Sequence, residues 1–427
     1  MRFTQLADWL AWQQSFHPRW IDLGLERVKH VFQALCPDYQ QPLTLTVGGT
    51  NGKGSCVAML EAILRAQGLR VGAYTSPHLL RYNERIRIDG VAVEDEAIVG
   101  AFARIDAARG ETSLSFFEFA TLAALELFAQ AKVEVQVLEV GMGGRLDAVN
   151  LIAADVALIA SIDLDHQQWL GETREQIGWE KAGIFRPGRP AVVGDRDVPQ
   201  SVLAWAEHLK TPLWCLGRQF DWQLLASGWD WLGPDEVIAS LPFPALPGRQ
   251  QLDNAATVLA ALSRIRDRLP ISRQAICQGL QSVHLPGRYQ LLPGSPPVLL
   301  DVAHNPQAAG RLAEYLQSAY PRRRILALFA AMSDKDIEGI VRRMGPVVSV
   351  WALAPLPDNP RAASEERIKQ AFQVAGFSPP LAGFESCIGA FKALRQQARP
   401  DDLIVVFGSF YLLAAFLAAG DGEWKPA

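Results

Sequence analysis

The stretch that decides the fold is residues 47–55, which read Val-Gly-Gly-Thr-Asn-Gly-Lys-Gly-Ser. The apolar run Leu43–Val47 predicts a strand before it, and the pattern of Gly54–Gln67 predicts a helix after it. A glycine-rich turn in this context lets backbone amides point at phosphate oxygens, and the helix N-terminus adds partial positive charge. We therefore expect a phosphate-binding loop in which Lys53 reaches the β- and γ-phosphates of a nucleotide and Ser55 caps the helix.

The spacing of this loop differs from the common Walker A motif. That motif would need glycine at position 47, which is Val47, and serine or threonine at position 54, which is Gly54. The competing interpretation is a glycine-rich turn with an exposed lysine.

Apolar runs without polar alternation continue on the C-terminal side of the loop, separated by helical patterns. Such runs are typical of a parallel sheet covered by helices on both faces, so we expect an α/β fold. The predicted strands are Arg70–Tyr74, Val133–Val140, Asp155–Ala160 and Ala191–Val193, and Ser115–Ala131 is predicted as a helix.

A second series of strands and helices predicts a smaller Rossmann-like α/β domain. Its predicted strands are Val298–Val302, Ile325–Ala330, Val347–Leu353 and Leu403–Phe407, with a helix at Pro306–Ala319. We expect an N-terminal domain over residues 1–287, a linker over 288–297 and a C-terminal domain over 298–427, because Leu285–Pro297 is rich in proline and glycine. The Trp-rich segment Trp214–Leu241 is predicted to form a β-hairpin.

Composition indicates an ordinary globular protein and argues against disorder. The chain of 427 residues is 49% hydrophobic and 20% charged, with a net charge of −4 and no basic run, so we expect no nucleic-acid partner. Five scattered cysteines fit a reducing compartment. Met1–Trp12 lacks the apolar core of a signal peptide. The uncharged run Leu403–Gly420 is interrupted at Gly408-Ser409, so we expect a buried strand and a helix there and no membrane span. We expect a cytoplasmic protein.

Polar residues follow several predicted strands and are candidates for holding Mg²⁺. Glu139 ends an apolar strand, and His166 follows another directly after Asp165. Ser76 could supply a hydroxyl. Lys181 could take up CO₂ and become a carbamate ligand. The competing interpretations are a paired structural glutamate, a packed histidine and a surface lysine.

Several motifs together resemble those of the bifunctional folylpolyglutamate synthase/dihydrofolate synthase family of the Mur ligase superfamily. The resemblance covers essentially the whole chain. It is carried by Thr46–Ser55, Thr75–Leu79, Phe117-Glu118, Leu138–Asn150, Asp165-His166 with Gly171, Glu180–Phe185, Leu285–Arg288 and Asp301–Pro306.

This resemblance implies roles for individual residues. It implies ATP contacts at Thr50, Asn51, Gly52, Lys53, Gly54, Ser55, Asn254, Arg288 and Asp301. It implies two Mg²⁺ ions held by Ser76, Glu139, His166 and a carboxylated Lys181, with Lys53, His166 and Lys181 as catalytic residues. It implies contacts to dihydropteroate or folate from Asp22, Ser115, Phe116, Phe117, Glu118, Leu146, Asp147 and Ala148, and to glutamate from His304 and Ser409.

The implied reaction joins L-glutamate to dihydropteroate and to reduced folates at the expense of ATP. We expect a monomer that uses small-molecule substrates. One departure from the family pattern is Val149, where threonine is usual. The alternatives are a folylpolyglutamate synthase only, another Mur-type ligase, a P-loop switch or kinase-like protein, and a nucleotide-binding structural protein. A cell-wall ligase would usually carry a further N-terminal domain, for which the residues before the phosphate loop are too few.

Overall fold

The chain divides into two compact units. The computed structural model describes residues 2–19, 21–234 and 236–419. Unit 1 comprises residues 1–245 and 251–284, and unit 2 comprises residues 246–250 and 285–427. The chain passes from unit 1 to unit 2 after His284, and the short earlier segment Leu246–Gln250 also belongs to unit 2.

Unit 1 is built on an eight-stranded sheet in the order β4-β3-β2-β5-β1-β6-β7-β8. Its strands from β2 to β8 along this order are parallel, and β3 and β4 extend it in antiparallel fashion. The strands are β1 Leu43–Gly48, β2 Val71–Tyr74, β3 Ile86–Ile88, β4 Val91–Ala92, β5 Val135–Glu139, β6 Val156–Ile159, β7 Ala191–Val193 and β8 Leu213–Cys215.

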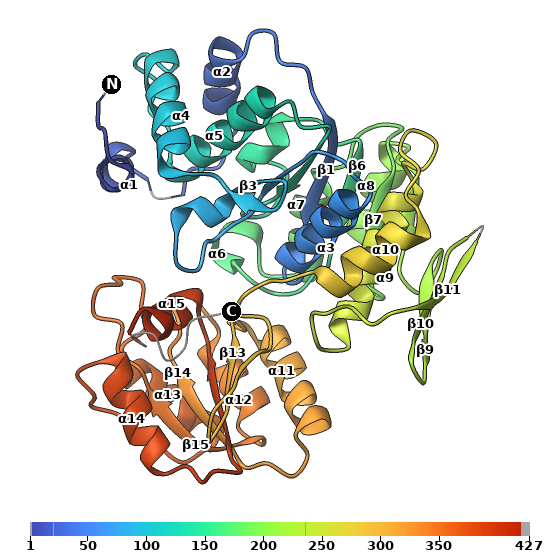
Figure 1. The fold of residues 1–427 in the computed structure, drawn as a ribbon. Helices are drawn as coiled ribbons and strands as arrows, with labels where there is room; N and C mark the ends of the chain where they lie inside the picture. Colours follow the sequence, from blue (N-terminus) through green and yellow to red (C-terminus); the bar gives the residue numbers. More distant parts are fainter. Residues whose placement is uncertain (1, 20, 235, 420–427) are drawn as a thin grey trace. The chain divides into compact units, whose positions relative to one another are not determined.

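Helices cover both faces of this sheet, because its central strands are buried along their whole length. Helix α3 packs on β1, β2 and β5 and against α10, while α5 covers the other face near β2 and β3 (Figure 1). The helices of unit 1 are α1 Leu6–Phe16, α2 Glu26–Leu35, α3 Lys53–Ala66, α4 Asp95–Ala108, α5 Phe116–Ala131, α6 Gln167–Leu170, α7 Arg174–Ala182, α8 Gln200–His208, α9 Gln250–Ser263 and α10 Arg273–Ser282. Two 3-10 turns span Tyr82–Arg85 and Ala148–Leu151.

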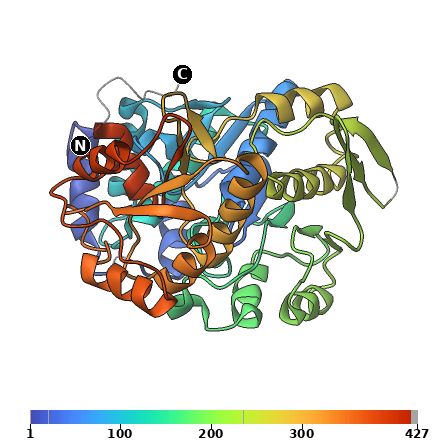
Figure 2. The same ribbon diagram turned by 90° about the horizontal axis from the view of Figure 1, so that it is seen from below.

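The Trp-rich segment contains the predicted hairpin, but it forms more than a hairpin. Trp214 lies in β8 of the main sheet, and a separate three-stranded antiparallel sheet follows, with β9 Asp221–Leu225, β10 Gly228–Leu232 and β11 Val237–Leu241. This small sheet projects from unit 1 beside α9 in both views (Figures 1 and 2). The Trp231 indole N–H donates to the Ala256 carbonyl (3.0 Å), and that of Trp222 to Asp253 (2.9 Å), so tryptophans anchor it on the helix.

Unit 2 is a second α/β layer structure with a five-stranded sheet in the order β12-β13-β16-β14-β15. Only β12 is antiparallel to its neighbour. The strands are β12 Gln290–Leu292, β13 Val298–Asp301, β14 Ile325–Phe329, β15 Val348–Leu353 and β16 Leu403–Phe407. The helices are α11 Pro306–Ala319, α12 Ile337–Met344, α13 Glu365–Ala375, α14 Cys387–Gln396 and α15 Phe410–Ala419. The stretch expected as a linker, 288–297, contains β12 and is therefore part of this sheet.

The uncharged C-terminal run folds as expected. Leu403–Phe407 is a buried strand and Phe410–Ala419 a helix, and Gly420 lies outside the described residues. Among the residues that the structure describes, no helix has the length and apolar character needed to cross a membrane.

Candidate active site

The predicted phosphate loop joins β1 to α3 and is shaped by its glycines. Gly49 and Gly52 have φ angles of 137° and 89°, which side chains on L-residues rarely allow. Lys53 is the first residue of α3, and its Nζ atom donates to the carbonyl oxygens of Gly49 (3.0 Å) and Thr50 (3.2 Å). The ammonium group therefore lies over the loop, as a phosphate-binding lysine requires.

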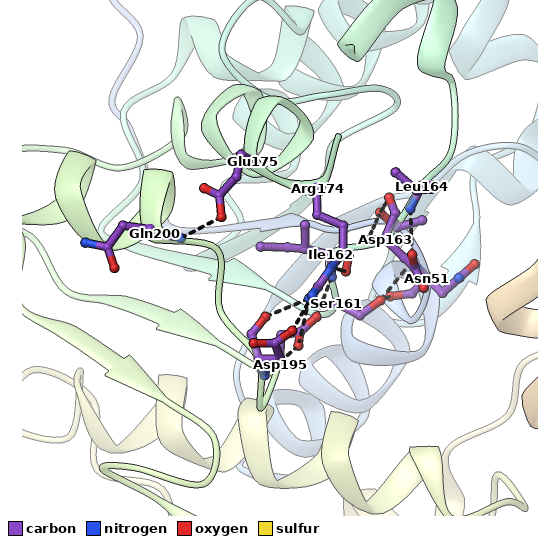
Figure 3. A network of polar contacts seen from close by, with 11 residues as sticks. Asn51, Ser161, Ile162, Asp163, Leu164, Arg174, Glu175, Asp195 and Gln200 are labelled. Carbon is purple, nitrogen blue, oxygen red and sulfur yellow. Dashed lines mark hydrogen bonds and ion pairs between the residues drawn. The ribbon is translucent and has the colours of Figure 1, made fainter. Parts of the chain in front are cut away.

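The loop after β6 is bonded directly to the phosphate loop (Figure 3). Thr50 donates its backbone N–H to the Ser161 carbonyl oxygen (2.7 Å), and its hydroxyl bonds both the carbonyl oxygen and the N–H of Asp163 (3.0 Å each). The Ser161 hydroxyl accepts from the Asn51 N–H (3.1 Å) and donates to the Asn51 carbonyl oxygen (3.0 Å). Because of these bonds, the segment that leads to His166 is fixed relative to the phosphate loop.

Glu139 lies beside the start of the phosphate loop. It ends β5, is only 4% exposed, and is paired in register with Val47 of β1. Its Oε2 atom accepts from the Ser76 N–H (3.2 Å), which places the loop after β2 at the same edge of the sheet. The carboxyl ends of β2, β5, β1 and β6 are neighbours in the sheet, so Ser76, Glu139, Lys53 and His166 lie on one edge, as the sequence predicted.

Two lysines and two carboxylates affect one another electrostatically at this edge. Lys181 is 3% exposed, and its pKa is lowered to about 7, first by burial and then by the positive charge of Lys53; Asp165 and Asp147 partly oppose the shift. A side chain with this pKa is in part uncharged near neutrality, so it can act as a nucleophile. Lys181 is therefore no surface lysine.

His166 begins α6 in an unusual backbone conformation. Its φ angle is 52°, its backbone N–H donates to Asp165 (2.8 Å), and its Nε2 atom lies 4.0 Å from the Asp165 Oδ2 atom. Its side chain is 29% exposed, so the ring keeps access to solvent and to a ligand.

Asn254 reaches the phosphate loop from a distant part of the chain. It is buried on α9, and a Cβ atom added to Gly52 would come within 2.6 Å of its Oδ1 atom. Its amide nitrogen donates to Gln251 (2.9 Å). The structure thus brings the expected asparagine to the expected loop.

A second polar cluster lies between the loop before α2 and the start of α5. Arg27 forms ion pairs with Asp22 (2.8 Å) and Glu118 (3.2 Å), and the Glu118 Oε2 atom accepts from the Ser115 N–H (2.7 Å). Ser115 and Glu118 form the capping box of α5, so both also have a structural role. His17 contacts Asp22 at 3.0 Å.

The other predicted folate contacts surround the glycine turn after β5. A Cβ atom on Gly141 would come within 2.6 Å of the Phe117 ring, and Leu146 accepts at its carbonyl from the Gly24 N–H (3.2 Å). Asp147 accepts from the N–H groups of Met142 (2.9 Å) and Val149 (3.0 Å). Burial raises the pKa of Asp147 to about 6, although the bonds from N–H groups and the charge of Lys53 oppose this shift.

Phe116 and Ala148 are less closely tied to this turn. The Phe116 ring packs against Tyr82, and the Arg85 guanidinium lies 5.3 Å above it. Ala148 is buried in the 3-10 turn that Asp147 caps. The buried Val149 is the residue where the resemblance would have threonine.

Unit 2 gathers its own set of predicted residues at the carboxyl end of β13. Asp301 is buried and accepts from the N–H groups of Tyr289 (3.2 Å) and Ala303 (2.8 Å). Burial raises its pKa to about 6, against the charges of Arg288 and His304. Ser409 accepts from the Leu412 N–H (3.0 Å) and so caps α15. Its hydroxyl therefore has a structural role beside the predicted one.

The donor set of unit 1 fits a hard divalent cation. Glu139 offers carboxylate oxygen, His166 imidazole nitrogen and Ser76 a hydroxyl. Across residues 2–19, 21–234 and 236–419, no group of three or more His, Cys, Asp or Glu side chains comes together as a metal centre. A cation here would therefore need further oxygen ligands, such as phosphate oxygens or a carbamate on Lys181.

Comparison with known protein families identifies the two domains of this architecture. Residues 47–220 match the model of the Mur ligase middle domain, and residues 287–410 match that of the Mur ligase glutamate ligase domain. A sheet with this phosphate loop, followed by a glutamate ligase domain, defines an ATP-dependent ligase of the Mur type.

Relatives that match this chain along its full length identify the family within the Mur-type ligases. The chain is 42% identical to the dihydrofolate synthase/folylpolyglutamate synthase of Escherichia coli strain K12, over 98% of this chain and 96% of the relative. The chain belongs to the dihydrofolate synthase/folylpolyglutamate synthase family, and it is an enzyme of the ligase class.

Two solved structures are similar over nearly all of both chains. Escherichia coli FolC in complex with DHPP and ADP has a TM-score of 0.92 at 41% identity, covering 98% of each chain. A bifunctional folylpolyglutamate synthase/dihydrofolate synthase with Mn, AMPPNP and L-glutamate bound has a TM-score of 0.90 at 44% identity, covering 97% of this chain and 98% of that one. The predicted family and fold class are confirmed.

Sequence reasoning missed several residues that hold the site together. Ser161 lies shortly after β6 and Arg27 lies in the first turn of α2, and neither position in the sequence indicates its contacts. Arg174 and Asp195 carried no signal, because their importance depends on contacts between distant segments. A charged residue at the start of a helix or after a short strand is common, so its position in the sequence does not predict such a contact.

Proposed function

We propose that this enzyme joins L-glutamate to 7,8-dihydropteroate, giving dihydrofolate, and to the γ-carboxylate of reduced folates, giving folylpolyglutamates. ATP is converted to ADP and phosphate in both reactions. The observation that carries the proposal is the gathering of Lys53, Glu139, His166 and Lys181 at the edge of one sheet. Full-length similarity to bifunctional relatives supports the two acceptors.

The chemistry proceeds through an activated acyl group, because a carboxylate does not react with an amine in water. The acceptor carboxylate attacks the γ-phosphorus of ATP, forming an acyl phosphate and releasing ADP. The uncharged amine of glutamate then attacks the acyl carbon, phosphate leaves with the bonding electrons, and the nitrogen loses a proton to give the amide. Lys53 and the N-terminus of α3 stabilise the negative charge that gathers on the transferred phosphoryl group.

Ser76, Glu139 and His166 would hold Mg²⁺, and we propose two ions. When bound, these cations neutralise phosphate charge and position the phosphoryl group. Lys181 would reach the second ion after its uncharged amine attacks CO₂, forming an N-carboxylate and releasing a proton. Its lowered pKa and its burial support this modification.

The nucleotide and glutamate contacts divide between the units. Thr50, Asn51, Gly52 and Asn254 would contact ATP from unit 1, and Arg288 and Asp301 from unit 2. His304 and Ser409 would place glutamate. We accordingly assign folate binding and most of the ATP contacts to unit 1, and glutamate ligation to unit 2.

The pterin acid would lie along the turn after β5 and the start of α5. Phe117 lies against Gly141 and offers an aromatic face, while Asp147 offers a buried carboxyl group and Glu118 a paired one. We propose that the enzyme acts as a cytoplasmic monomer, for which a single peak of monomer mass in solution would be the expected measurement.

Release of ADP, followed with dihydropteroate or tetrahydrofolate and with or without L-glutamate, tests the function. We expect glutamate-dependent release with both acceptors. Release with tetrahydrofolate only would reduce the enzyme to folylpolyglutamate synthesis, and release independent of glutamate would refute ligation. Lys53→Ala should abolish turnover, whereas Lys29→Ala, on the exposed side of α2, should leave it unchanged.

A further inference from the structure

The backbone N–H and the backbone carbonyl of Ile162 are each held by a charged side chain from another element (Figure 3). Its N–H donates to the Asp195 Oδ2 atom (2.8 Å), and its carbonyl oxygen accepts from the Arg174 Nε atom (3.1 Å). Arg174 begins α7, and Asp195 follows β7. Hydrogen bonds that involve charged groups are the stronger kind, so Asp195 and Arg174, the two anchors, restrain the backbone on both sides of Ile162.

The two anchors are joined to each other and to their surroundings. The Arg174 guanidinium donates to Asp195 (3.5 Å) and to the carbonyl oxygen of Asp197 (2.6 Å). The other Asp195 carboxylate oxygen accepts from the Asp197 N–H (3.0 Å). The Asp195 side chain is 12% exposed, so it is well shielded from water. The anchors thus form a fixed support beneath the loop after β6.

The residues on either side of Ile162 bond the phosphate loop. Ser161 is tied to Asn51, and Asp163 is tied to the Thr50 hydroxyl. The loop after β6 is therefore held between the phosphate loop on one side and the Arg174–Asp195 pair on the other. The same short loop continues to Asp165 and His166.

We infer that Arg174 and Asp195 are positioning residues for the nucleotide and its divalent cation. They fix the loop after β6 so that Thr50, Asn51 and His166 keep one spacing. This inference rests on the proposed function, because it takes the phosphate loop and His166 as the nucleotide–cation site. Neither anchor is proposed to contact substrate.

Loss of an anchor would free the loop without removing any ligand. Residues that orient metal ligands commonly affect metal affinity by 10- to 100-fold when replaced. A loosened loop must also be ordered again on binding, which costs conformational entropy. We therefore expect weaker nucleotide–cation binding, with the fold retained.

Asp195→Ala tests the inference, with Glu175→Ala as a matched control. Glu175 neighbours Arg174 on α7, and its carboxylate accepts from the N–H groups of Gln200 (3.1 Å) and Ser201 (2.7 Å), remote from the loop (Figure 3). Both changes remove a carboxylate that accepts backbone hydrogen bonds. Only the first removes one from the loop after β6.

The measurements are the Kd of ADP in the presence of Mn²⁺, by calorimetry, and the hydrogen exchange of residues 161–166 in the ligand-free protein. Asp195→Ala should raise the Kd about tenfold and speed exchange in this segment. Glu175→Ala should change the Kd less than about twofold, although it lowers the melting temperature. Asp195→Asn keeps one oxygen acceptor for the Ile162 N–H, so it should lie between these extremes and serves if the alanine variant does not fold.

Equal Kd values for wild type, Asp195→Ala and Glu175→Ala would overturn the inference, as would unchanged exchange of residues 161–166. A purely structural role would lower the melting temperature of both variants and leave their Kd values alike. Failure of the proposed function is distinguishable from failure of this inference. If wild-type protein binds ADP with Mn²⁺ but shows no glutamate-dependent ADP release, ligation is refuted. The Kd values of the variants would still test the roles of Arg174 and Asp195.

Discussion

Gly52 and Asn254 lie so close together that a Cβ atom on the glycine would come within 2.6 Å of the asparagine Oδ1 atom. The glycine belongs to the phosphate loop, and the asparagine to α9. Because Asn254 is buried and bonded to Gln251, it has little room to withdraw. The close approach explains why this position of the loop needs a residue without a side chain.

Gly52→Ala should therefore abolish nucleotide binding. The φ angle of 89° strains any other residue by about 1–2 kcal/mol, and the new methyl group would displace Asn254 or the loop. We expect a lower melting temperature and no detectable binding of ADP by calorimetry.

Gly68→Ala separates these two causes. Gly68 has the same φ angle of 89°, yet a Cβ atom there would meet nothing within 4 Å. This variant should lose stability to a similar degree from backbone strain and still bind ADP. If both variants bind ADP equally well, the contact between Gly52 and Asn254 has no part in the site.

Lys181→Ala should lose ligase activity that short carboxylic acids such as acetate partly restore. The proposed N-carboxylate supplies an anionic oxygen, and a free carboxylate can enter the space that the buried side chain leaves. Activity would be measured as glutamate-dependent ADP release over a series of acetate concentrations. Lys53→Ala is the control, because an anion cannot replace the positive charge that Lys53 provides. Rescue of both variants, or of neither, would contradict the proposed role of Lys181.

Local pattern made much of the fold predictable. The strand before the phosphate loop was placed within a residue, and Ala191–Val193 and Leu403–Phe407 agree with the structure at both ends, because buried parallel strands are continuous apolar runs. In the Trp-rich segment the hairpin was predicted, but its third strand and the strand of the main sheet were missed. The alternation there is weak, and its tryptophans bond α9, a partner that local pattern does not reveal.

Contacts between distant segments limited prediction of the site. Lys53 was found because a glycine turn between strand and helix has its own signature. Nothing near Asp195 in the sequence indicates that its carboxylate accepts from Ile162. Ser409 shows the converse limit, because the hydroxyl that the resemblance assigned to glutamate also caps a helix.

Glu118→Gln should weaken ligation of dihydropteroate. The carboxylate pairs with Arg27, which in turn holds Asp22, so the change loosens the loop before α2 at the proposed pterin side. We expect the KM for dihydropteroate to rise about tenfold, since Arg27, whose side chain is 30% exposed, loses the charge of its buried partner Glu118. Steady-state ADP release at saturating ATP and glutamate would measure it.

Glu126→Gln is the matched control for this change. Glu126 lies on the same helix, is similarly buried and pairs with Arg104. It should lower stability in the same way and leave the KM for dihydropteroate near that of wild type. Equal rises in KM for the two variants would mean that Glu118 acts through helix stability alone.

Asp301 should make the stability of the protein depend on pH in a direction opposite to that of an ordinary paired carboxylate. Burial raises its pKa from 3.8 to about 6 in the folded chain. Folding therefore favours its protonated form, so its contribution to stability is complete below pH 3.8 and is lost as the pH rises through about 6. An asparagine at this position stays neutral throughout. We expect the free energy of unfolding of wild type, relative to Asp301→Asn, to fall by about 1 kcal/mol between pH 5 and pH 7. Urea unfolding of both full-length proteins at several pH values measures this difference. A difference that stays constant over this range, or that grows with pH, would show that the buried carboxyl group does not take up a proton on folding.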